Sequence, residues 1–159
     1  MDTYDVRTHG IWSSHFADAG NSENSAYDVS NATVKEHAVW WLWPNTALLR
    51  YPGRSNFMVF QILPTGPDRT LETWDFFLES TELDEAEQQS VSYIDEVLQV
   101  EDIQLVESVQ RGMSTPAFNQ GRIVYDPERT PGLSEHGVHH FHGLVLDAYR
   151  TLTSGNSAS

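Results

Sequence analysis

Residues 83–113 read LDEAEQQSVSYIDEVLQVEDIQLVESVQRGM, with no proline and no glycine before Gly112. Their apolar residues recur at helical spacing and do not alternate as they would in a strand. The run therefore predicts one long helix, with a break expected near its start. On a helical wheel, a single apolar stripe is formed by Val91, Ile94, Leu98, Leu105, Val106, Val109 and Met113.

Asp102 falls near the centre of this stripe, which is an unusual position for a carboxylate. An ionised Asp buried without a partner is costly, so it is expected to be neutralised, paired with Arg, capped by hydrogen-bond donors, or bound to a metal. Two interpretations stay open: a core Asp bonded to Arg, Trp or Tyr, or a metal ligand. Glu101 and Glu107 fall largely on the flanking faces, which favours solvated or supporting roles for them.

The chain before this helix is typical of antiparallel strands. Short β-prone segments bounded by proline and glycine occupy residues 38–43, 46–51, 56–63 and 70–78. Residues 4–16 suit one further strand, and residues 21–31 a polar loop.

The chain after the long helix predicts a connection, a second helix and a tail. Residues 116–131 form the connection, with a short strand possible at 122–125, and residues 134–152 form the helix. Residues 153–159 are rich in Ser, Gly and Asn and are expected to be disordered. Strands followed by helices predict an α+β domain spanning residues 1–152, with helices covering one face of an antiparallel sheet.

Composition excludes several classes of function. The 9 basic against 23 acidic residues give a net charge of -14, which argues against binding to a nucleic-acid backbone. The chain has no cysteine, so it has no disulfide, no thiolate nucleophile and no complete ligand set for a Rieske cluster. No signal peptide and no membrane span is visible, and the expected location is the cytoplasm.

A histidine cluster lies near the C-terminus, at His136, His139, His140 and His142. The pairs 136/140 and 139/142 could each share a helical face, and two imidazoles one turn apart can chelate zinc or iron. The spacing fixes no third ligand. The favoured interpretation is that these histidines fill a core and bond to backbone carbonyls.

Residues 99–113 closely resemble the iron-ligand helix of Rieske oxygenase α subunits. The resemblance continues through Ala117-Phe118-Asn119-Gln120-Gly121-Arg122, His139-His140-Phe141-His142 and, upstream, Trp41-Leu42-Trp43-Pro44-Asn45, so that it spans roughly residues 40–152. It implies a helix-grip fold, of the START or Bet v 1 type, in which an antiparallel sheet wraps a long helix.

The same resemblance implies a mononuclear Fe(II) held by two His and one carboxylate, with Asp102 as the carboxylate and so a catalytic residue. Residues 139–142 match a family segment not known to supply iron ligands, which supports their packing role. The family's iron histidines and its Rieske domain lie N-terminal to everything seen here, and neither is present in this chain. His9, His15 and His37 lack the Asn/Glu-rich helical context of that pair and are not assigned to the metal.

The domain is therefore expected to be incomplete and inactive alone, with the 2Fe-2S cluster in a missing N-terminal part or in another chain. A reductase or ferredoxin component would deliver electrons from NAD(P)H, O2 would be the co-substrate, and a homotrimer is common in the family. Within the family, residues 100–121 look most like the choline, carnitine and glycine-betaine monooxygenases, which implies a small trimethylammonium substrate. Trp40, Trp41 and Trp43 could offer ring faces to such a cation, although core packing is the favoured interpretation.

Two other functional classes stay open. The chain could be a non-catalytic helix-grip binding module with Asp102 as a buried hydrogen-bond acceptor, or a subunit of an aromatic ring-hydroxylating dioxygenase. Iron content separates the binding module from the oxygenases, and a substrate screen separates the two oxygenases.

Overall fold

The structure is a computed structural model that describes residues 4–18, 32–130 and 132–155. Six strands form one antiparallel sheet in chain order, and helices follow them. The strands are β1 (Asp5–His9), β2 (Trp12–Asp18), β3 (Glu36–Leu42), β4 (Thr46–Arg50), β5 (Asn56–Gly66) and β6 (Arg69–Leu78). The helical elements are α1 (Glu85–Tyr93), the π-helical turn η1 (Ile94–Leu98), α2 (Gln99–Met113) and α3 (His136–Gly155). The predicted α+β class and the four strands β3 to β6 are confirmed.

The N-terminal segment is a hairpin, so the prediction of one strand over residues 4–16 was wrong. The chain turns at Gly10, whose positive φ of 37° is readily adopted by glycine. The amide of Trp43 then donates to the carbonyl of Ile11 at 2.9 Å and ties the turn to the end of β3. The loop predicted at 21–31 lies outside the described residues.

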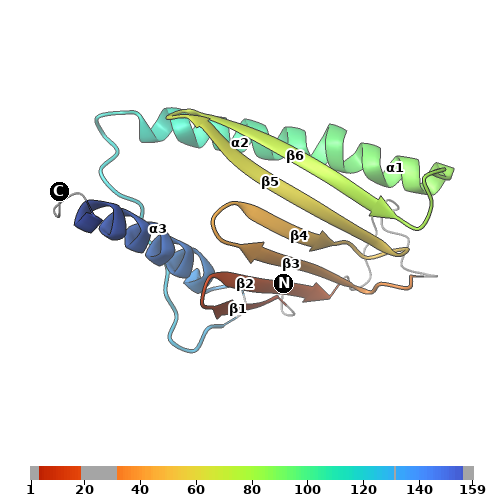
Figure 1. The fold of residues 1–159 in the computed structure, drawn as a ribbon, viewed down its shortest axis with the longest axis horizontal. Helices are drawn as coiled ribbons and strands as arrows, with labels where there is room; N and C mark the ends of the chain where they lie inside the picture. The colour runs from red at the N-terminus through yellow and green to blue at the C-terminus, as the bar shows by residue number, and fades with distance from the viewer. Residues whose placement is uncertain (1–3, 19–31, 131, 156–159) are drawn as a thin grey trace.

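Both helical segments cover the same face of the sheet. The strand register puts Trp41, Leu49 and Met58 on one face, because alternate residues of a strand share a side. Ile94 of η1 packs against Leu49 and Met58 in the buried core, while Phe141 of α3 contacts Trp41. Figure 1 shows the consequence: the long helix runs along β5 and β6, and α3 lies beside β1 and β2.

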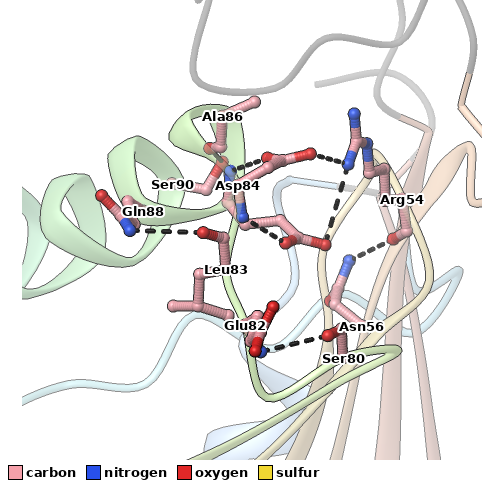
Figure 2. Close-up of polar contacts among 10 residues, drawn as sticks. Arg54, Asn56, Ser80, Glu82, Leu83, Asp84, Ala86, Gln88 and Ser90 are labelled. Atoms are coloured by element: carbon pink, nitrogen blue, oxygen red, sulfur yellow. Dashed lines mark hydrogen bonds and ion pairs between the residues drawn. The ribbon is translucent and has the colours of Figure 1, made fainter.

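The start of the long helix is fixed by a capping box. The Asp84 carboxylate accepts from the Glu87 amide, and the Glu87 carboxylate accepts from the Asp84 amide, each at 3.0 Å. Arg54, in the connection between β4 and β5, pairs with Asp84 and lies 3.8 Å from a Glu87 carboxylate oxygen (Figure 2). The break expected near the start of the helix does not occur. The helix continues to Met113 through the π-helical turn η1.

The C-terminal part differs from the prediction at two points. Residues 122–125 form no strand. The Glu135 amide donates to the Val124 carbonyl at 2.7 Å. Helix α3 continues to Gly155, three residues past the predicted end at Leu152, so the predicted disordered tail begins as helix. Residues 156–159 lie outside the described residues. Within the described ranges, no helix is long and apolar enough to cross a membrane.

Candidate functional site

Asp102 lies on α2, one turn after Leu98, and its side chain is exposed. The expected burial of this carboxylate was wrong, because only the first part of the apolar stripe lies on the sheet. Ile94 is buried and Leu98 is partly buried against the core, and the Gln99 amide donates to Glu72 of β6 at 2.7 Å. Beyond that contact the stripe faces outward, with exposed fractions of 50% to 60% at Leu105, Val106, Val109 and Met113.

Asp102 acts electrostatically on Tyr51, which directly follows β4. Burial raises the pKa of Tyr51 above its ordinary value, and the nearby charge of Asp102 raises it further. The Asn56 amide holds this tyrosine in place, because it accepts from the Tyr51 N–H and donates to the Tyr51 carbonyl, both at 2.9 Å. The Tyr51 ring lies 4.8 Å from that of His37 at the start of β3.

The described residues do not form a metal centre on their own. No three of their His, Asp or Glu side chains are arranged to hold an ion together. Glu107 is 3.9 Å from Arg111, one turn further along α2, and lies on the surface. Asp102 is therefore exposed and not part of a ligand cluster among the described residues, so an iron bound there would need ligands from outside them.

The α3 histidines attach that helix to the first hairpin. His136 is buried; its Nε2 donates to the Val6 carbonyl at 2.8 Å and its Nδ1 lies 3.1 Å from the Ser134 hydroxyl. One turn later, His140 Nε2 donates to the Gly10 carbonyl at 3.0 Å. The predicted bonding to backbone carbonyls is confirmed for His136 and His140, which share a helical face as their spacing predicted. His139 and His142 are exposed, so the predicted core packing was wrong for these two.

A pocket of about 390 Å³ lies between this end of the sheet and α3. Five of its nine lining residues carry rings, and the lining consists of Tyr4, Ser13, His15, His37, Val39, Trp41, Gly137, Val138 and Phe141. Sequence reasoning missed this pocket, because its residues come from strands and a helix far apart in the chain. The available signal was the alternation along β2 and β3, which puts their ring residues on one face once the register is known.

The two pocket histidines are held in neutral form. His15 Nδ1 bonds to the Tyr4 hydroxyl at 2.9 Å and His15 Nε2 to the Ser13 hydroxyl at 3.0 Å. Burial lowers the pKa of His15, and nearby His136 and His37 lower it further. Burial also lowers the pKa of His37. For both imidazoles, burial therefore favours the neutral form.

The three tryptophans of the 40–43 segment have different surroundings. Trp41 lines the pocket and contacts Phe141, which Trp43 also contacts with ring centroids 5.6 Å apart. Trp40 faces the other side of the sheet, where it meets the ring of Phe16 at 5.8 Å and the guanidinium of Arg50 at 6.0 Å. Of the three, Trp41 is the one placed to contact a ligand in this pocket.

The described residues thus form an α+β domain, with an antiparallel sheet, helices on one face and a pocket between the sheet and α3. The family model for the ring hydroxylating alpha subunit (catalytic domain) matches residues 5–151, and this chain belongs to that family. The resemblance inferred from the sequence is thus confirmed, and the oxygenase subunits that the chain matches are enzymes.

The individual relatives described next are monooxygenases. The carnitine monooxygenase oxygenase subunit of Escherichia coli is 32% identical over 151 residues, which is 94% of this chain and 40% of that protein. The corresponding subunit of Acinetobacter baumannii is 35% identical, with the same two coverages. The chloroplastic choline monooxygenase of Spinacia oleracea is 37% identical over 102 residues, which is 63% of this chain and 21% of that protein. This chain thus spans about 40% of the length of the carnitine monooxygenase subunits.

Solved structures confirm the fold. A quaternary ammonium Rieske monooxygenase described in relation to carnitine oxidation by gut microbiota has a TM-score of 0.81 and 32% identity, covering 91% of this chain and 38% of that one. The same kind of enzyme, CntA, in complex with its substrate L-carnitine has a TM-score of 0.75 and 30% identity, covering 91% of this chain and 36% of that one.

Proposed function

We propose that this chain is the catalytic-domain part of a Rieske oxygenase α subunit that hydroxylates a small quaternary ammonium compound, with O2 and with electrons from NAD(P)H. The observation that carries the proposal is the match over 94% of the chain to carnitine monooxygenase subunits at 32% to 35% identity. Because those subunits are much longer, the activity is proposed for the α subunit as a whole. The proposed location is the cytoplasm.

Asp102 is the proposed carboxylate ligand of a mononuclear Fe(II). The carboxylate is exposed on α2, and no hydrogen bond or ion pair within the described residues occupies it. Two histidines from outside the described residues would complete the ligand set. When bound, the iron supplies the activation of O2, and the protein positions the substrate.

The remaining partners follow from the family. A reductase or ferredoxin component would deliver the electrons, and a 2Fe-2S cluster in another part of the α subunit or in a partner chain would pass them on. A homotrimer, or a complex with a chain carrying the Rieske domain, would bring that cluster to the iron. One of the similar structures is described in terms of inter-subunit electron transfer, which supports such an assembly.

A non-catalytic binding module is the second candidate function. It is favoured by one observation: the described residues line an open, ligand-sized pocket but do not form a metal centre. Oxidation of an aromatic ring is less well supported, because the similar proteins act on carnitine or choline.

The test is NAD(P)H-dependent O2 uptake by the chain assembled with its Rieske-bearing part and a reductase. Carnitine, choline and glycine betaine are compared with a neutral aromatic hydrocarbon. The proposal predicts uptake with at least one quaternary ammonium compound, abolished in Asp102→Ala and retained in Glu101→Ala, its exposed neighbour. Uptake only with the hydrocarbon, or equal uptake by the Asp102→Ala variant, would contradict it.

A further inference from the structure

The first turn of α3 packs directly on His15 of β2. Gly137 of α3 has no side chain, and a methyl group at that position would lie 3.4 Å from His15 Cε1 and 3.1 Å from Val6 Cγ1. Both ring nitrogens of His15 are engaged, one by the Tyr4 hydroxyl and the other by the Ser13 hydroxyl. The imidazole therefore lies between its own hairpin and α3, in the wall of the pocket.

The neighbours that face this imidazole include no carboxylate within the described part of the chain. Its titratable neighbours are the hydroxyl of Tyr4 and the rings of His37 on β3 and His136 on α3. Val6 of β1 and Val39 of β3 are its partners in the strand register. No Lys, Arg, Asp or Glu is among the residues that line the pocket.

The charged side chains of the adjacent strands belong to the opposite face of the sheet. Alternate residues of a strand share a side, and the register places His15 on the same side as Val6 and Val39. The titratable residues of the other side are Asp5, Arg7 and His9 of β1, Asp18 of β2 and Glu36 of β3. A proton on His15 would thus add a partly buried charge next to two further imidazoles.

The two histidines that attach α3 to the hairpin can keep their bonds in acid. His136 Nε2 donates to the Val6 carbonyl at 2.8 Å, and His140 Nε2 donates to the Gly10 carbonyl at 3.0 Å. An imidazole that takes up a second proton still has a donor at Nε2, so both bonds can persist. His15, which α3 covers, is therefore the group through which acid can act on this contact.

Helix α3 is attached to the rest of the fold at few points. The connection from α2 contains no helix or strand in its described residues, 114–130 and 132–135. Among the strands, α3 makes its main backbone contacts with β1, and Phe141 adds ring contacts with Trp41 and Trp43. A segment held by few contacts can open locally while the core stays folded.

We propose that His15 is an acid-sensitive latch: when its ring takes up a proton, the start of α3 leaves the first hairpin and the pocket opens. The two events are coupled because the charged ring gains full contact with water only when α3 moves away. The opening needs neither iron nor substrate, so it can be tested apart from the activity proposed for the α subunit.

The direction of the pH response follows from the environment of the ring. Burial lowers the pKa of His15 while α3 is docked, and His136 and His37 lower it further. After release, the pKa of the ring returns toward its ordinary value of about 6.5. Docking is therefore at full strength above about 6.5 and weakens as the pH falls toward the lowered value. One pH unit below 6.5, an ordinary imidazole is protonated about 10:1, so the released population can rise up to about tenfold.

Hydrogen–deuterium exchange of the chain, followed by mass spectrometry at pH 7.5 and 5.5, measures this release. Protection factors, corrected for the intrinsic effect of pH on exchange, are compared between α3 and β4 in the interior of the sheet. We expect the protection of α3 to fall about tenfold between the two pH values, and to stay below that of β4 because α3 opens locally. An α3 protection that does not change with pH, or that equals the protection of β4 at both values, would overturn the proposal.

Glutamine variants identify the responsible imidazole. His15→Gln keeps a side chain that can donate and accept but cannot be protonated in this range, so most of the pH response of α3 should disappear. His142→Gln is the matched control, because His142 is exposed on the same helix, and it should keep the response. Circular dichroism shows whether each variant is folded. A response of native size in His15→Gln would overturn the proposal.

Gly137→Ala tests the contact and leaves His15 unchanged. The added methyl group would crowd Val6 and His15, so the protection of α3 should fall already at pH 7.5. Gly143→Ala is the control, because a methyl group at Gly143 of the same helix would meet no atom within 4 Å. The higher helix propensity of alanine should leave protection equal or raised in that variant. Unchanged or raised protection in Gly137→Ala would contradict the packing of α3 on His15.

Discussion

Trp41 of β3 and Phe141 of α3 meet edge to face, with ring centroids 5.6 Å apart and ring planes at 79°. Trp43 meets the same phenylalanine at 5.6 Å and 60°. Phe141 thus packs against two tryptophans from a distant part of the chain. This contact, with the bonds made by His136 and His140, attaches α3 to the sheet and forms one wall of the pocket.

Removal of the Phe141 ring should loosen α3. We expect Phe141→Ala to lower the free energy of unfolding by about 2 kcal/mol, less than for a fully buried Phe because this side chain is only partly covered. Urea denaturation measures the change. Tyr149→Ala is the control, since this residue of the same helix is 65% exposed and its loss should cost under about 0.5 kcal/mol. Equal costs would contradict the docking role of Phe141.

His136 should contribute to stability without binding a metal. Only 6% exposed, it bonds through both ring nitrogens, so His136→Ala should cost about 1–3 kcal/mol by leaving the Val6 carbonyl and the Ser134 hydroxyl without this partner. His142→Ala, at an exposed position of the same helix, should cost little. Thermal melts with and without added Zn²⁺ measure both effects. A metal-dependent rise in Tm that disappears in His136→Ala would show that the cluster is a metal site.

Stability should fall as the pH drops below neutrality, because the pocket histidines are buried in neutral form. Burial lowers the pKa of His15 and His37 in the folded chain, whereas in the unfolded chain both return to about 6.5. Their contribution is therefore full above about 6.5 and is lost as the pH falls toward the depressed folded values. Urea denaturation from pH 7.5 to 5.5 measures this slope. His37→Phe, which keeps a ring but cannot be protonated, should flatten it, and an unchanged slope would contradict the explanation.

The capping box should contribute more to the thermal stability of the chain than the ion pair between Arg54 and Asp84. Asp84→Ala should lower the Tm by about 2–5 °C, because the Glu87 amide loses its acceptor, while Asp84→Asn should retain most of the cap. Arg54→Ala should have a smaller effect, since its ion pair with Asp84 is exposed.

The same cap should also weaken in acid. The bond from the Glu87 amide, with Arg54 in support, lowers the pKa of Asp84, so its contribution is present above the ordinary Asp value and is lost as the pH falls through the folded value. Melts at neutral and acidic pH should show the Asp84→Ala deficit shrinking in acid, and a deficit independent of pH would contradict this.

The sequence predicted the parts of the fold that depend on local patterns. Strands β3 to β6 follow from short β-prone segments bounded by proline and glycine, and the long helix follows from apolar residues at helical spacing. The first hairpin was missed because its turn consists of Gly10 and Ile11, and of these two only glycine is a typical turn residue. The pocket was missed because it depends on the register of β2 against β3 and on where α3 docks, and neither is encoded locally.

The burial of Asp102 was predicted wrongly for a related reason. A helical wheel shows which side chains share a face, but it does not show where the neighbouring sheet ends. Ile94 and Leu98 lie on the sheet, whereas Leu105 and Val106, on the same stripe, are exposed.

The most direct test of the account is the iron content of the chain. The chain is produced anaerobically with Fe(II), alone and together with the product of any adjacent reading frame, as native sequence, Asp102→Ala and Glu101→Ala. We expect little iron in the chain alone, because its described residues form no metal centre, and about one iron per chain in a complex that supplies the two histidines. That iron should be lost in Asp102→Ala and kept in Glu101→Ala. Iron retained in Asp102→Ala, or absent from every preparation, would contradict the assignment of Asp102 as an iron ligand.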